Sequence, residues 1–123
     1  MTKRRLLLVA VGGAAGATLR WAVSTLDVTS AFPWPTLLVN VLGAGLLGWL
    51  IATKPAPDRL ALIGAGFCGG LTTFSTLSVE VAELLRDDAA VTGWLYLLLS
   101  VFLGSVTFLV GRLAGQTVEG TVA

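Results

Sequence analysis

Long apolar segments joined by short polar connections make up most of this chain. Tryptophans lie at or near the ends of these segments, as expected for amphipathic rings at the level of lipid headgroups: Trp21, Trp34, Trp49 and Trp94. A helix that crosses a bilayer needs about 20 largely apolar residues. Four segments meet this requirement: residues 6–23, 35–53, 60–85 and 89–111. The pattern therefore predicts an all-α membrane protein, a single four-helix transmembrane domain over residues 1–123.

Composition excludes several other classes of protein. With 55% hydrophobic residues, 12% charged residues and a mean hydropathy of +0.88, the chain does not resemble an ordinary soluble domain. Cys68 is the single cysteine and histidine is absent, so neither an intrachain disulfide nor a Cys/His metal site is expected. A net charge of +1 gives no indication of nucleic-acid binding. No nucleophile–base pair or phosphate-binding loop is evident, so we do not expect an enzyme.

The basic N-terminus allows two interpretations. Lys3, Arg4 and Arg5 precede an apolar run, as in a signal peptide. The apolar segment continues to Arg20, however, and three further spans would hold the protein in the membrane after any cleavage. We therefore interpret this segment as the first transmembrane helix.

Lysine and arginine are distributed unequally between the two sides of the predicted bundle. One side carries the two termini and the second connection, with six basic residues: Lys3, Arg4, Arg5, Lys54, Arg59 and Arg112. The opposite side carries Arg20 and Arg86. Because basic residues concentrate on the cytoplasmic side, we expect a multi-pass protein of the inner (plasma) membrane with both termini in the cytoplasm.

Glycines have two expected roles. Small residues let helices approach closely in lipid, and Gly12, Gly16, Gly66 and Gly70 have the four-residue spacing of such contacts. Gly69 and Gly70 also precede a run of hydroxyl residues near the middle of the third span. Unwound backbone is tolerated at that depth where it lines a cavity or is buried in protein. We therefore expect the third helix to be broken near mid-span, with free carbonyls able to bind a cation.

Polar side chains within the predicted spans are candidate functional residues, because such groups are costly in lipid: Arg20, Asn40, Glu80, Tyr96 and Ser100. Each also has a purely structural interpretation, as interhelical packing or, for Arg20, as extension to the interface. On helical spacing, Thr72, Thr76 and Glu80 share one face, and Phe74 and Leu77 lie on a neighbouring face. Hydroxyl and amide groups can replace part of an anion's hydration shell, and an aromatic ring has an electropositive edge. We therefore predict a permeation path for an anion.

Three segments resemble the successive signatures of the small bacterial fluoride channels, the Fluc or CrcB family: GGAAGATLRW at 12–21, TLLVNVLGAGLLG at 36–48 and GFCGGLTTFSTLSVE at 66–80. The resemblance implies an antiparallel dimer of four-helix subunits. Its two narrow pores would pass fluoride passively, exclude chloride and export toxic cytoplasmic fluoride.

The resemblance also implies roles for individual residues. The implied pore positions are Arg20, Asn40, Phe74, Ser75, Thr76, Leu77, Glu80, Tyr96 and Ser100. The backbone carbonyls of Gly69 and Thr72 correspond to those that hold a structural sodium ion at the dimer interface.

Two positions depart from the family pattern. Leu77 stands where a second pore phenylalanine is expected, and Gly104 where a hydroxyl might continue the polar track of the fourth helix. Together with the unequal distribution of basic residues, these departures favour pairing with an oppositely oriented paralog, in which this chain would be a half-conducting or non-conducting subunit. A homodimer that tolerates Leu77 is the alternative. A small multidrug-type transporter is a third possibility, but it needs an acidic residue in the first helix, which has none.

Overall fold

The computed structural model describes residues 2–26 and 31–122. Four helical spans are long and apolar enough to cross a membrane: Lys3–Ser24, Trp34–Ala52, Pro57–Arg86 and Ala90–Thr117. The predicted all-α class with four spans is therefore confirmed. The helices are α1 (Lys3–Ser24), α2 (Trp34–Ala52), α3 (Pro57–Arg59), a π-helical segment η1 (Leu60–Cys68), α4 (Gly69–Leu71), α5 (Phe74–Arg86) and α6 (Ala90–Val122).

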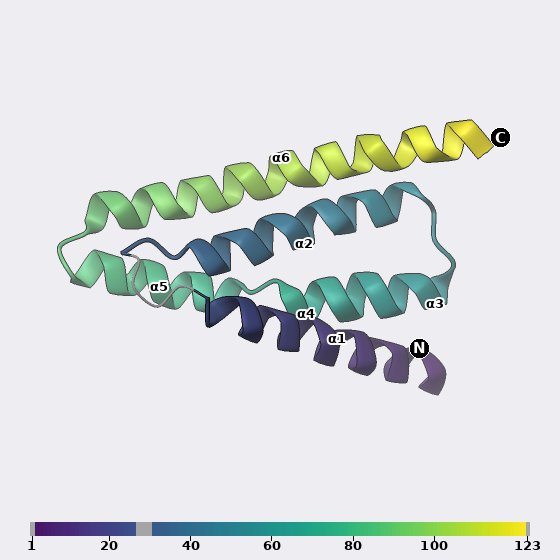
Figure 1. Ribbon diagram of the computed structural model, residues 1–123, viewed down its shortest axis with the longest axis horizontal. Helices are drawn as coiled ribbons and strands as arrows, with labels where there is room; N and C mark the ends of the chain where they lie inside the picture. Colours follow the sequence, from purple (N-terminus) through teal and green to yellow (C-terminus); the bar gives the residue numbers. More distant parts are fainter. Residues whose placement is uncertain (1, 27–30, 123) are drawn as a thin grey trace.

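The four spans run side by side (Figure 1). α6 packs along α2, α1 packs against η1 and α4, and α5 packs against α6. Both termini and the connection between α2 and α3 lie at the same end of the bundle (Figure 1). A chain that crosses the bundle four times ends on the side where it began.

Backbone contacts at glycine bring the helices together. A Cβ atom built on Gly111 would overlap the carbonyl oxygen of Gly45, and one on Gly48 would overlap that of Phe108. These contacts join α2 to α6. The predicted contact faces of the first and third spans are also confirmed, because Cβ atoms there would overlap backbone atoms of the facing helix at Gly12, Gly16, Gly66 and Gly70.

The bundle has a central pair of spans and two outer ones. Within their most apolar 18-residue windows, α2 is 39% buried and the third span 33%, whereas α1 and α6 are each 11% buried. Leu37, Leu77 and Tyr96 form a small buried core where α2, α5 and α6 meet. The remaining apolar surface of the outer helices is available to lipid or to another chain.

The third span is broken near its middle, which confirms the prediction. Thr72 (φ −80°, ψ 154°) and Thr73 (φ −149°, ψ 124°) are extended, and they separate α4 from α5. Gly69 and Gly70 are helical, and the extended residues begin two positions after Gly70. Gly70 instead packs closely against the backbone of Gly13. The groups freed at the break bond to Asn40 and to the Thr73 hydroxyl.

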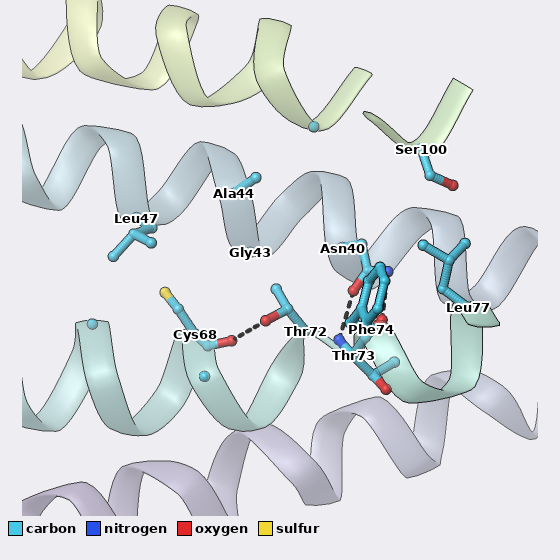
Figure 2. Close-up of a pocket in the computed structure, with 13 residues that line it drawn as sticks. Asn40, Gly43, Ala44, Leu47, Cys68, Thr72, Thr73, Phe74, Leu77 and Ser100 are labelled. Carbon is cyan, nitrogen blue, oxygen red and sulfur yellow. Dashed lines mark hydrogen bonds between the residues drawn. The ribbon is translucent and has the colours of Figure 1, made fainter. Parts of the chain in front are cut away.

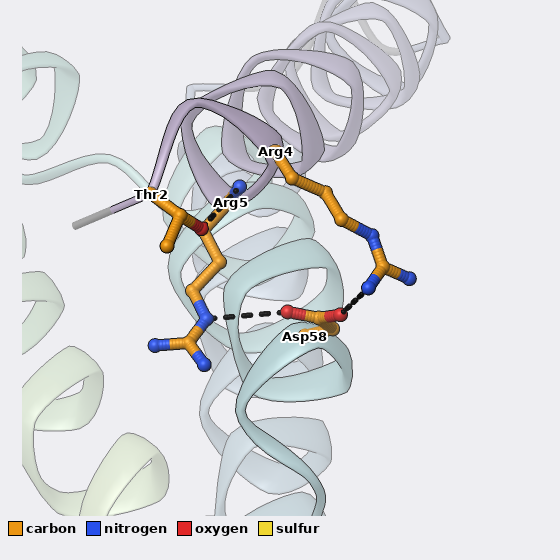
Figure 3. Close-up of polar contacts among 4 residues, drawn as sticks. All are labelled: Thr2, Arg4, Arg5 and Asp58. Carbon is orange, nitrogen blue, oxygen red and sulfur yellow. Dashed lines mark hydrogen bonds and ion pairs between the residues drawn. The ribbon is translucent and has the colours of Figure 1, made fainter.

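Ion pairs link the start of α1 to the start of the third span (Figure 3). Arg4 Nη1 lies 2.7 Å from Asp58 Oδ2, and Arg5 Nε donates to Asp58 Oδ1 over 3.2 Å. The Thr2 hydroxyl accepts a hydrogen bond from the Arg5 amide and so caps α1. These contacts lie at the end of the bundle that carries the termini.

Candidate functional site

The side-chain amide of Asn40 on α2 bonds to both backbone groups of Thr73 (Figure 2). Asn40 Oδ1 accepts from the Thr73 N–H over 2.7 Å, and Asn40 Nδ2 donates to the Thr73 carbonyl over 3.0 Å. Thr73 is buried, and an unpaired backbone group would be costly at this depth. Asn40 therefore supplies the hydrogen bonds that an uninterrupted helix would have supplied.

The hydroxyl of Thr73 begins the next helix. Its oxygen accepts from the Thr76 N–H over 3.1 Å, which is the usual contact of a threonine at a helix N-cap. The same hydroxyl lies 3.0 Å from Thr76 Oγ1 and 3.2 Å from Ser75 Oγ. Three neighbouring hydroxyls thus form a small polar cluster at the start of α5.

Two backbone carbonyls lose their helical partners at the break. In a continuous α-helix, the N–H groups of Thr73 and Thr76 would donate to the carbonyls of Gly69 and Thr72, four residues earlier. Here these N–H groups donate to Asn40 Oδ1 and Thr73 Oγ1. Both Gly69 and Thr72 line the same cavity. Carbonyl oxygens there could bind a cation without displacing a helical hydrogen bond.

A cavity of about 400 Å³ lies beside the break, lined by α2, the third span and α6 (Figure 2). Six of the predicted site residues line it: Asn40, Gly69, Thr72, Phe74, Leu77 and Ser100. Phe74 is 77% exposed, so the described residues of this chain leave most of its ring uncovered. A large exposed apolar ring at the edge of a mostly apolar cavity is suited to contact with another chain.

A second cavity, of about 440 Å³, holds three more of the predicted residues. Arg20, Ser75 and Thr76 line it, together with Thr73. Both ion pairs found among the described residues involve Asp58, so Arg20 forms none there. The guanidinium and the nearby hydroxyls can all donate hydrogen bonds. Thr73 lines both cavities, so this residue separates one from the other.

The carboxylate of Glu80 joins three helices. Glu80 Oε1 accepts from Thr36 Oγ1 on α2 over 2.8 Å, and Oε2 accepts from the Tyr96 hydroxyl on α6 over 2.7 Å. Tyr96 is fully buried. Thr36, Thr76 and Glu80 also line a third cavity of about 340 Å³ toward the end of the bundle remote from the termini. Within α5, Thr76 and Glu80 share a face as expected, but the break separates Thr72 from it.

The remaining predicted residues of this region are Leu77 and Ser100. Leu77 is buried against Leu37 and Tyr96, although it also contributes to the first cavity. The Ser100 hydroxyl donates to the Tyr96 carbonyl of its own helix over 2.7 Å. At Gly104, one turn further, a built Cβ atom meets no heavy atom of the described residues within 4 Å. The first cavity therefore has open space at Gly104.

Two residues of the site were not predicted as such. Thr36 lies four residues before Asn40 on α2, and this spacing, which places both on one helical face, could have indicated it. Thr73 was one of several adjacent hydroxyls. Its role depends on Asn40, which lies 33 residues away in the sequence, so no local pattern could have distinguished it.

Comparison with known proteins identifies the family of this chain. The model of the family described as CrcB-like protein, Camphor Resistance (CrcB), matches residues 7–112. The chain is similar to fluoride-specific ion channel FluC 2 of Rhodococcus jostii, with 46% identity over 80% of this chain and 87% of that protein. It is also similar to fluoride-specific ion channel FluC of Methanopyrus kandleri, with 43% identity over 94% of this chain and 92% of that protein. This chain therefore belongs to the CrcB family.

Proposed function

We propose that this protein is a fluoride-selective channel that passively exports cytoplasmic fluoride and so lowers its toxicity. The observation that carries the proposal is the polar break of the third span, where Asn40, Thr73 and Phe74 lie beside a cavity at the middle of a membrane bundle. The relatives named as fluoride-specific ion channels match most of the chain. We infer a channel because the relatives are named as channels and because the described residues that line the cavities offer hydrogen-bond donors.

The proposed path uses the residues of the three cavities. Arg20 and the hydroxyls of Ser75 and Thr76 would attract and partly dehydrate the anion. The amide of Asn40 retains one N–H beyond the one that it donates to Thr73, and the edge of the Phe74 ring is electropositive. Leu77, Glu80, Tyr96 and Ser100 would form the continuation of the path toward α6.

We further propose that the channel is an antiparallel dimer. The cavity beside Phe74 is open on one side of the subunit, and the ring is largely exposed, so a second chain is needed to close it. The partner is either a second copy or an oppositely oriented paralog. The six-to-two distribution of basic residues favours the paralog, with both termini of this chain in the cytoplasm. In that case this chain would be a half-conducting or non-conducting subunit.

A structural sodium ion fits the proposed interface. The carbonyls of Gly69 and Thr72 lack their usual helical donors, and uncharged backbone oxygens are suitable ligands for an alkali cation. When bound, the ion would supply positive charge that links the two chains. Gly69 leaves open space at its Cα, since a built Cβ atom meets no heavy atom of the described residues within 4 Å.

Fluoride efflux from liposomes tests the function. The purified chain is reconstituted alone and, separately, with a paralog if one co-purifies, and efflux of fluoride and chloride is followed in the same preparation. Rapid, fluoride-selective efflux from the chain alone would support a self-sufficient channel and contradict the obligate heterodimer. Efflux only from the pair would support the heterodimer. Folded protein that is silent in both preparations would overturn the channel proposal.

A further inference from the structure

The break in the third span depends on a residue of another helix. At Thr72 and Thr73 the backbone is extended, with no glycine or proline at either position to require it. Thr72 and Thr73 could otherwise continue the α-helix that ends at Leu71. Asn40 is the group that compensates for the lost helical bonds, through contacts of 2.7 and 3.0 Å to a single residue.

The chemistry of these two contacts is specific. A side-chain amide has an acceptor and a donor side by side, so it can pair with the N–H and the carbonyl of one extended residue as a neighbouring β-strand would. Asn40 is held on α2, a regular helix that is among the most buried elements of the bundle. Its position is therefore set mainly by the packing of α2 against α6.

We propose that Asn40 is a positioning residue that holds the third span open and thereby presents the Gly69 and Thr72 carbonyls to a cation. The cation in this proposal is the sodium ion of the proposed function, so the proposal rests on that function. The role of Asn40 described here is separate from any direct contact with fluoride. Without Asn40, the Thr73 N–H has the Gly69 carbonyl as its nearest helical alternative, and an α-helical turn would remove that carbonyl from the cavity. The Asn40 amide thus determines whether this segment forms a continuous helix or exposes carbonyls that can bind a cation.

Backbone conformation provides the decisive test. In isotope-labelled protein, the ¹³Cα secondary chemical shifts of Thr72 and Thr73 report extended or helical backbone. We expect extended values in the wild type. In Asn40→Leu, which keeps the branched side-chain skeleton but removes both bonds, we expect a change toward helical values, including a change of sign at Thr73. Asn40→Asp retains an oxygen acceptor for the Thr73 N–H, so Thr72 and Thr73 should keep their extended shifts in this variant. Extended shifts in Asn40→Leu would overturn the proposal. So would an equal loss of the extended shifts in Asn40→Leu and Asn40→Asp.

A matched control separates this effect from general loss of packing. Thr107 on α6 donates to the Val41 carbonyl on α2 over 3.0 Å, so Thr107→Val also removes an interhelical hydrogen bond from α2. This variant should leave the Thr72 and Thr73 shifts at their wild-type values. Shifts that move equally in Thr107→Val would contradict a specific role for Asn40.

Sodium-dependent stability tests the second half of the proposal. Sodium should raise the melting temperature of the wild type relative to a large organic cation, and Asn40→Leu should lose at least about half of that rise. An unchanged sodium response in Asn40→Leu would overturn the link between Asn40 and the cation. If the shifts and the sodium response change as expected but the wild type passes no fluoride, the proposed function fails while the positioning role stands.

Discussion

The hydroxyl of Tyr96 donates a 2.7 Å hydrogen bond to Glu80 Oε2, and it does so from a side chain with no exposed surface. The contact joins α6 to α5, while the other carboxylate oxygen bonds to Thr36 on α2. One carboxylate thus connects the three helices that surround the small core at Leu37 and Leu77. Its position makes Glu80 as important for packing as for any ion path.

Removing this contact should destabilise the bundle. Tyr96→Phe keeps the ring in the core but deletes the hydroxyl, and we expect a loss of about 1–2 kcal/mol in the free energy of unfolding. Reversible unfolding in mixed micelles measures it. Ser105→Ala is the control, because that hydroxyl bonds within its own helix on an exposed face. Equal stability of Tyr96→Phe and the wild type would contradict the structural role.

Phe74 should be needed for conduction but not for folding of the subunit. Its ring is 77% exposed, so Phe74→Ala removes little intrachain packing. We expect at least about a tenfold loss of fluoride efflux, the equivalent of about 1.4 kcal/mol in the barrier, with unchanged helical content. Phe102→Ala, which truncates a ring that is 64% exposed on α6, should conduct normally. Wild-type efflux in Phe74→Ala would mean that the ring does not line the path.

Alanine substitutions should affect stability differently at a glycine in close helix contact and at a glycine beside open space. At Gly48 a methyl group would overlap the Phe108 backbone, so Gly48→Ala should lower stability by about 1–3 kcal/mol through forced separation of α2 and α6. At Gly104 a methyl group meets open space, and Gly104→Ala should be neutral or stabilising. Thermal unfolding of the two variants in the same detergent measures the difference. Similar losses in both would contradict the α2–α6 packing described here.

The ion pairs at Asp58 should contribute little to stability. Arg4 is 78% exposed, and exposed ion pairs are weakened by solvent and salt. Asp58→Asn should therefore cost less than about 1 kcal/mol, and the difference should shrink as salt is raised. Unfolding at low and high ionic strength measures this. A large, salt-independent loss would show that Asp58 has a further partner.

The spans could be predicted from the sequence because their signal is local. Each depends on a run of apolar residues long enough to cross the bilayer, and close contacts at Gly12 and Gly16 follow from their spacing. The approximate place of the break was also predictable, since hydroxyl residues gather near the middle of the third span.

The exact break was not predictable, because it depends on contacts between distant residues. Gly69 and Gly70 precede the break but are helical, and their lack of a Cβ atom permits close packing at Gly70 and leaves open space at Gly69. Thr73 is extended because Asn40, 33 residues earlier, pairs with its backbone. Thr36 and Glu80 are 44 residues apart. Such pairs are determined by how the helices pack, and helix packing cannot be predicted from a short segment of sequence.

Direct contact between the main chains of α2 and α6 has a consequence for how the protein can change over time. At Gly45 and Gly111 the separation of these helices is set by backbone atoms, whose dimensions do not vary with the side chains around them. The outer surface of α6, which carries exposed residues such as Leu98 and Val110, takes no part in this contact, so its residues can change with the lipid or the chain that they face. Adaptation to a new membrane can proceed on that surface without altering the dimensions of the cavity beside Phe74.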